Sequence, residues 1–142
     1  MPEIRSSDGS VRPGTTVSPG ELPALGLDGV DLVFIRIDYQ TRLQFGTTEV
    51  VIGTPFSLAT DDGDQTLDPA DRAGLGPLLS VYPAALASAV VETDLTLHLT
   101  FASGTRIEVP QDSHYEAWQV AGPGSRLIVC PPEGDRTLSY WR

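Results

Sequence analysis

The sequence predicts a mainly β domain, built from two repeated three-stranded antiparallel meanders that pack as a sandwich or partly open barrel, with a short helical connection between them. Three observations predict it. Apolar and polar residues alternate over residues 33–53, the alternation returns over residues 89–110, and a Gly-bearing turn interrupts each run. Alternation with period two indicates strands that bury one face.

The first run predicts three strands whose apolar residues share one buried face: Val33, Ile35 and Ile37, then Leu43 and Phe45, then Val50 and Ile52. Gly46-Thr47 fits a two-residue hairpin loop with Gly at the first position, as a type II′ turn requires. The expected register pairs Phe45 with Thr48, Leu43 with Val50, and Thr41 with Ile52. This register keeps the apolar side chains on one face.

The second run matches the first: Asp94 follows Asp38 by 56 residues, as do Leu99 and Phe101 after Leu43 and Phe45, whereas Ile107 and Val109 follow Val50 and Ile52 by 57. The extra residue lies in the second hairpin turn. A three-residue loop, 102–104, with Gly104 left-handed, absorbs it and pairs Leu99 with Ile107. We interpret the two runs as an internal duplication. On the opposite face this register pairs His98 with Glu108 and Thr100 with Arg106.

The remaining chain predicts smaller elements. Residues 1–26, rich in Pro, Gly, Ser and Thr, are expected to form a flexible arm before a single domain of residues 27–142. Residues 61–71 are expected to be an acidic loop, followed by a helical turn near 69–72 and a short helix near 77–82. Strands are expected near 115–120, 126–130 and 138–141.

Charge is the strongest compositional signal. The chain has 19 acidic residues and 9 basic ones, for a formal net charge of −10, and every basic residue is Arg. The absence of Lys excludes lysine-dependent mechanisms, and the acidity argues against nucleic acid as a partner. An acidic surface favours solubility and attracts a basic protein partner.

No long apolar run and no signal-like leader is seen, so we expect a cytoplasmic protein without a membrane partner. The lone Cys130, between Val129 and Pro131, is expected to be a small core residue rather than a reactive thiol. Both a monomer and a homodimer are consistent with the sequence.

Motifs for chemistry are not found. The acidic segment 61–71 lacks the Gly and Glu positions of a calcium loop, and the two histidines, His98 and His114, lack the partners of a zinc site. No serine has the setting of a nucleophile. We therefore expect no metal, no cofactor and no catalytic residues.

The segment QDSHYEAW, residues 111–118, carries the candidate binding residues His114, Tyr115, Glu116 and Trp118, to which we add Arg106 and, from the last strand, Trp141. Aromatic residues in such a cluster either close the core of a β-domain or contact a partner. Core closure is the first interpretation, partner contact the second, and a ligand site the third.

The stretches GTRIEVP (104–110) and YEAW (115–118) are the most distinctive of the chain. With them, the region from about Leu27 to Trp141 resembles a family of small acidic actinobacterial proteins classed as a domain of unknown function. The resemblance implies one β-rich domain and assigns no catalytic residues. The all-Arg composition agrees with a GC-rich genome.

The sequence leaves three functional hypotheses. The first is a non-enzymatic protein-binding domain, whose most specific form is an immunity-type antagonist of a basic toxin. The second is a small-ligand-binding protein or enzyme with a pocket between the repeats, where His114, Tyr115, Glu116 and Arg106 converge. The third is a self-associating structural domain whose exposed edge strands pair across a dimer.

Overall fold

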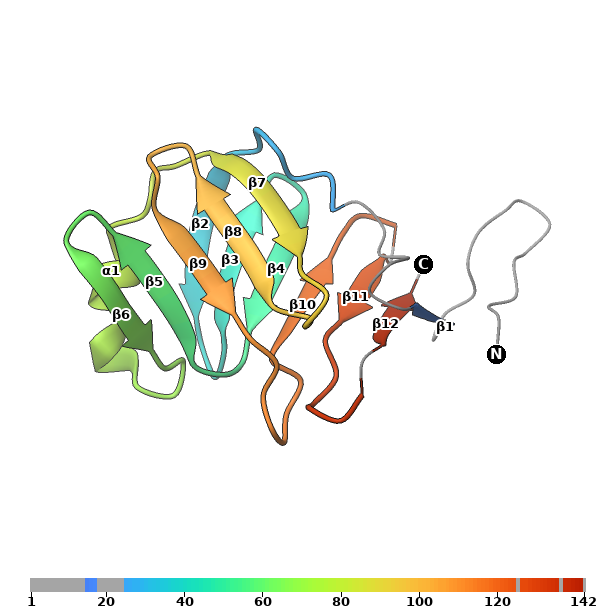
Figure 1. Ribbon diagram of the computed structural model, residues 1–142. Coiled ribbons are helices and arrows are strands. Elements are labelled where there is room, and N and C mark those ends of the chain that lie inside the picture. Colours follow the sequence, from blue (N-terminus) through green and yellow to red (C-terminus); the bar gives the residue numbers. More distant parts are fainter. Residues whose placement is uncertain (1–14, 18–24, 125, 136, 142) are drawn as a thin grey trace.

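The computed structural model describes residues 15–17, 25–124, 126–135 and 137–141 as a mainly β protein (Figure 1). Over these residues twelve strands form two antiparallel sheets that are not closed into a barrel. The predicted fold class is confirmed, and of its two forms the sandwich is present. In spatial order the larger sheet contains β1 (Thr15–Val17), β12 (Leu138–Trp141), β11 (Leu127–Val129), β10 (Trp118–Ala121), β4 (Thr48–Ile52), β3 (Thr41–Phe45) and β2 (Leu32–Ile37).

The smaller sheet contains, in spatial order, β6 (Gly63–Leu67), β5 (Phe56–Thr60), β9 (Arg106–Val109), β8 (Leu97–Phe101) and β7 (Leu86–Val91). The two predicted meanders are β2-β3-β4 and β7-β8-β9, one in each sheet. After its meander, each half of the chain crosses to the other sheet. There β5 pairs with β9, and β10 pairs with β4. Each sheet therefore contains strands from both halves of the chain.

The predicted hairpin registers are confirmed. Phe45 lies opposite Thr48 and Leu43 opposite Val50 in the first hairpin, and Leu99 lies opposite Ile107 in the second. Both turn glycines have positive φ, +57° at Gly46 and +94° at Gly104, which L-residues rarely adopt. The two meanders have the same local design, although their origin in a duplication stays a prediction.

The prediction that Val33 shares a face with Ile35 is wrong, because β2 contains a bulge. Leu32 pairs with Phe45 and Phe34 pairs with Gln44, so one extra residue separates the two pairs on β2. The bulge turns Leu32 into the core and leaves Val33 exposed. A matching bulge lies at Leu86 in β7.

The prediction of an acidic loop over 61–71 is also wrong in part, because β5 and β6 form a hairpin there, with Asp61 and Asp62 at its turn. The short helical connection follows, as a 3-10 turn (Arg72–Leu75) and then α1 (Gly76–Leu79). Leu75 and Leu78 of this connection are buried in the core. They fill space between the sheets at their open flank.

The core lies between the two sheets and is built from the alternate positions predicted to be buried. Leu43, Phe45, Leu99, Phe101 and Ile107 are all within 1% of complete burial. Cys130 is buried too, and burial raises the pKa of its thiol to about 12, as expected for a core residue rather than a reactive one.

Strands from near both ends of the chain, β1 and β12, belong to the larger sheet. Thr15–Val17, within the predicted arm, pairs with β12, and Leu25 is already buried, two residues before the predicted start of the domain. The other residues of the predicted arm up to 24 lie outside the described residues, so its flexibility stays a prediction. Among the described residues, no helix has the length and apolar character needed to cross a membrane.

Candidate functional site

Three loops lie at one end of the sandwich, shown at the bottom of Figure 1, and we call them together the loop end: residues 38–40, 110–117 and 131–135. The loops lie together because the strands that precede or follow them end or begin at this end of the sheet. The β2–β3 connection leaves the sheet where β4 ends, and β10, antiparallel to β4, begins at the same place, with Trp118 opposite Ile52. The segment QDSHYEAW therefore lies beside loops distant from it in sequence.

Loop 110–117 is fastened to loop 131–135 by Gln111. Its side-chain amide nitrogen lies 2.8 Å from the carbonyl oxygen of Asp135, 3.1 Å from that of Pro131 and 3.3 Å from that of Pro132. The backbone N–H of Glu133 donates to the carbonyl oxygen of Asp112 at 2.7 Å. These contacts hold two irregular loops in one arrangement, because a carbonyl without a partner would be costly.

Asp112 organises the tip of the same loop. Its carboxylate accepts the backbone N–H groups of His114 and Tyr115 at 2.9 and 3.0 Å, and these two bonds hold the pKa of Asp112 below its ordinary value of 3.8. The hydroxyl of Ser113 lies 2.7 Å from Nδ1 of His114. The Tyr115 side chain is 71% exposed. A fixed backbone thus presents an aromatic ring to solvent.

Trp118 anchors the end of loop 110–117 in the core. It is 1% exposed, and its indole N–H donates to the carbonyl oxygen of Leu95 at 3.0 Å. Leu95 has a φ of +65°, uncommon for a residue with a side chain, and its own side chain is fully buried. The backbone N–H of Cys130 donates to the Trp118 carbonyl oxygen at 3.0 Å. Trp118 closes the core, as the first interpretation of this segment predicts.

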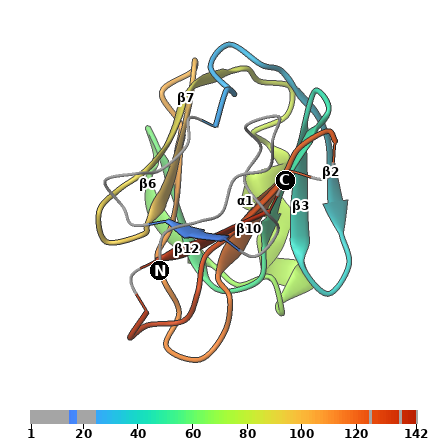
Figure 2. The same cartoon turned by 90° about the vertical axis from the view of Figure 1, so that its right-hand side faces the viewer.

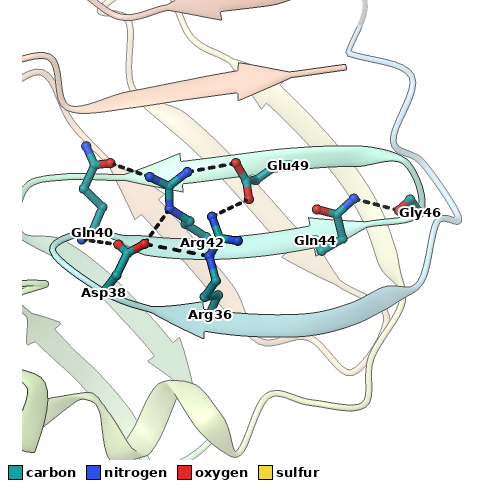
Figure 3. A network of polar contacts seen from close by, with 7 residues as sticks. All are labelled: Arg36, Asp38, Gln40, Arg42, Gln44, Gly46 and Glu49. Atoms are coloured by element: carbon teal, nitrogen blue, oxygen red, sulfur yellow. Dashed lines mark hydrogen bonds and ion pairs between the residues drawn. The ribbon is translucent and has the colours of Figure 1, made fainter. Parts of the chain in front are cut away.

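A polar network adjoins the loop end on the outer face of β2, β3 and β4 (Figure 3). The Arg42 guanidinium donates to Asp38 at 3.1 Å, to Glu49 at 3.0 Å and to Gln40 at 3.2 Å. Arg36 lies 3.7 Å from both carboxylates. The backbone N–H of Gln40, which also donates to Asp38, is the largest cause of the lowered Asp38 pKa. Two cations and two anions here neutralise each other.

The loop end itself is rich in carboxylates that form no ion pair within the described part of the chain. Four acidic residues lie on its two fastened loops, and among the described residues none of the four takes part in an ion pair: Asp112, Glu116, Glu133 and Asp135. Tyr39, in the third loop, is 90% exposed. The end therefore combines exposed tyrosine rings with acidic groups, a combination suited to contact with a basic protein surface.

The predicted binding residues are only partly brought together. His114, Tyr115 and Glu116 share the exposed loop. Arg106 starts β9, at the opposite end of that strand from the loop, and faces Thr100 and Ala59 across its neighbours. Trp141 ends β12, and its side chain lies outside the described residues. Nδ1 of His98 lies 3.8 Å from Oε1 of Glu108, so these two residues form the predicted pair on the outer face.

A shallow pocket of about 360 Å³ lies on the smaller sheet near the loop end, lined by residues of several strands: Pro55, Phe56, Ser57, Thr66, Thr96, Glu108 and Pro110. None of the residues proposed for a ligand pocket lines it, so that hypothesis stays a prediction. Among the described residues, no group of three or more His, Cys, Asp or Glu side chains is placed to hold a metal ion.

The fold and this end define a class: a two-sheet β-sandwich with an acidic, tyrosine-bearing loop surface. A family described as a family of unknown function, DUF6188, matches residues 23–142, and the chain belongs to that family. The predicted membership of a family of unknown function is confirmed, while its actinobacterial character stays a prediction. Neither the curated proteins nor the solved structures include a match to this chain.

Tyr39 and Gln111 are the candidate residues that the sequence patterns do not reveal. In the sequence, Tyr39 is one residue of a short turn between two strands. Gln111 contacts backbone carbonyl groups that lie 20 to 24 residues further along the chain. No periodicity or short motif reports such distant contacts. The strand pairing of β10 with β4 is what makes both residues part of one surface.

Proposed function

We propose that this chain is a non-enzymatic protein-binding domain that uses the loop end to contact a basic protein. The observation that carries the proposal is the position of Tyr115, which is exposed on a loop held by Asp112 and Gln111. It stands among carboxylates that form no ion pair with any residue the structure describes. Tyrosine is enriched among the residues that dominate binding energy at protein interfaces.

The fastened loops support the proposal through the cost of ordering. A loop that must become ordered on binding loses conformational entropy, at about 0.5–1.5 kcal/mol for each immobilised side chain. The contacts of Gln111 and Asp112 remove part of that cost before a partner arrives. The loop end is therefore preorganised for recognition.

Charge supports the choice of partner. The chain has a formal net charge of −10, and Arg36 and Arg42 next to the loop end are already paired with Asp38 and Glu49. Negative potential there attracts a basic surface and speeds the encounter. In its most specific form the proposal is an immunity-type antagonist, which blocks a basic toxin by covering its positive site.

The test is affinity capture from a native lysate with the full chain as bait, followed by measurement of the dissociation constant. We expect a basic partner whose binding weakens as salt rises. Tyr115→Ala and Glu116→Lys are expected to raise the dissociation constant by roughly tenfold or more, which corresponds to about 1.4 kcal/mol. A toxin gene beside the gene for this chain supports the antagonist form.

Asp64→Lys is the matched control, because it changes net charge as Glu116→Lys does but lies on β6, away from the loop end. The dissociation constant of the control variant is expected to stay within a few-fold of that of the unmodified chain. Equal losses in both lysine variants would show that total charge, not the loop end, governs binding. Capture of no stoichiometric partner would also contradict the proposal.

A further inference from the structure

The larger sheet ends at β2 on one side, and this edge is apolar, which is unusual for an edge strand. β2 ends the strand order, and Figure 2 shows it along one margin of the molecule. Four large apolar side chains here are about half exposed: Val33 48%, Phe34 44%, Leu79 51% and Tyr82 49%. With Ile35 they line a groove of about 290 Å³ between β2 and the helical connection. Edge strands commonly carry charges that prevent pairing, but Arg36 is the one charged residue within β2.

The backbone of β2 offers hydrogen bonds along this edge. The two-residue hairpin places Phe45, Leu43 and Thr41 in hydrogen-bonded pairs with β4. The backbone N–H and C=O groups of the alternate residues, Gln44 and Arg42, therefore point toward β2. Their partners on β2, Phe34 and Arg36, therefore make backbone hydrogen bonds to β3. The backbone N–H and C=O groups of Ile35 and Ile37 point away from β3, toward the edge. Among the described residues, neither isoleucine has a partner on that side.

The start of β2 limits how much of the edge is free. The N–H of Leu32 donates to the carbonyl oxygen of Ala84 at 2.7 Å, and Asp31 forms a bridge with Ala85. Within the part of the chain that the structure describes, residues 33–37 therefore make up the free segment. An added strand must be short and must align with these five positions.

We propose that β2 pairs antiparallel with β2 of a second copy of this chain, across a two-fold axis at Ile35. This register uses the whole free segment, because Ile35 meets its own counterpart and Val33 meets Ile37 of the other copy. It also places Phe34 opposite Arg36 in the close, non-hydrogen-bonded position on the outer face. The two larger sheets then form one continuous sheet.

Arg36 and Phe34 are complementary across the axis. The Arg36 guanidinium, which lies 3.7 Å from Asp38 and from Glu49, is more than half exposed. In this register it lies beside the Phe34 ring of the other copy, and a cation is attracted to the face of an aromatic ring. The two-fold axis forms this contact twice. A strand of an unrelated protein lacks the reciprocal pair.

The second layer of the sandwich agrees with the same symmetry. At this flank the layer facing β2 is the helical connection, and its last residue, Leu79, lines the groove with Tyr82, three residues further on. An axis beside β2 brings the two helical connections toward each other beneath the joined sheets. The apolar side chains of both layers then lose water together, which gives the pairing a hydrophobic contribution in addition to its hydrogen bonds.

The test is sedimentation velocity of the full chain from micromolar to millimolar concentration. We expect a reversible monomer–dimer equilibrium. Phe34→Arg, which places a cation opposite Arg36, and Leu79→Glu are expected to raise the dimer dissociation constant by roughly tenfold or more. Circular dichroism checks that both variants fold, as expected for exposed positions.

Val90→Arg is the matched control, because Val90 is 46% exposed on β7, the edge strand of the other sheet. It is expected to dimerise like the unmodified chain. A monomer at every concentration, a normal dimer in Phe34→Arg, or loss of the dimer in Val90→Arg would each overturn the proposal.

Hydrogen exchange gives a readout that needs no variant. The amides of Ile35 and Ile37 are expected to exchange fast in dilute solution and to become protected at dimer concentrations. The amides of Phe34 and Arg36, bonded to β3, are expected to be protected at both. Unchanged exchange at Ile35 and Ile37 in a dimer would show that the copies meet through another surface.

Discussion

Phe45 and Phe101, which occupy matching positions in the two meanders, contact each other in the core, with ring centroids 6.2 Å apart and planes tilted by 36°. Each ring is 1% exposed. Each comes from the second strand of its meander, immediately before the hairpin turn. The contact therefore joins the two sheets at equivalent places.

Phe45→Ala and Phe101→Ala are each expected to lower the free energy of unfolding by about 3–5 kcal/mol, since each removes a buried ring and leaves a cavity. The double variant is expected to lose less than the sum, by about 0.5–1.5 kcal/mol, because the rings interact. Urea denaturation measures all three losses. Tyr39→Ala, at an exposed position, is the control, with an expected change within about 0.5 kcal/mol. Strict additivity would show that the rings do not interact.

Asp38 and Asp94 also match, and each carboxylate accepts the backbone N–H two residues later, from Gln40 at 2.9 Å and from Thr96 at 3.0 Å. The bond from Thr96 is the largest cause of the lowered Asp94 pKa. A lowered pKa in the folded state adds stability that is present above the ordinary value of 3.8 and is lost as pH falls through the folded value.

Asp94→Asn keeps an acceptor oxygen but removes the charge. The unmodified chain is expected to be more stable than this variant at neutral pH, and the difference is expected to shrink below pH 3.8, where the carboxyl of the unmodified chain becomes protonated. Denaturant unfolding of both proteins across this range measures the difference. A difference independent of pH would mean that the charge does not contribute.

The hairpin registers were predictable because they depend on neighbouring residues. Gly46 and Gly104 define the turns, and alternation then fixes which residues face inward. The bulge that exposes Val33 was not predictable, because an extra residue leaves no mark in the alternation of a short strand. The β5–β6 hairpin was missed because its second strand has Gly63 and three polar residues and is exposed at four of its five positions, as an edge strand facing solvent can be.

The candidate site was predictable only where its contacts are local. The segment 111–118 is conspicuous in sequence, and the buried position of Trp118 agrees with core closure. The neighbours that complete the loop end, 38–40 and 131–135, come from the exchange of strands between the sheets. Pairing between distant strands is not encoded in local patterns, so the full surface emerges only in three dimensions.

Cys130 gives a prediction at alkaline pH. Burial raises the pKa of its thiol from an ordinary 9.0 to about 12, so the thiol stays neutral in the folded chain while it ionises in the unfolded chain. The stability that this group adds is full below pH 9.0 and is lost as pH rises from there toward 12. The stability difference between the unmodified chain and Cys130→Ala is therefore expected to shrink over that range, as followed by denaturant unfolding. A constant difference would contradict a raised pKa.

Gln111 gives a prediction about the loop end. Gln111→Ala removes an amide that lies near three carbonyl oxygens, so we expect the sandwich to remain folded while loops 110–117 and 131–135 loosen, at a cost of about 1–3 kcal/mol for the freed carbonyls. The amide of Glu133, which donates to Asp112, is the reporter and is expected to exchange faster. Gln44→Ala is the control, because the Gln44 amide donates to Gly46 within its own hairpin. Unchanged exchange at Glu133 would mean that the two loops hold each other without Gln111.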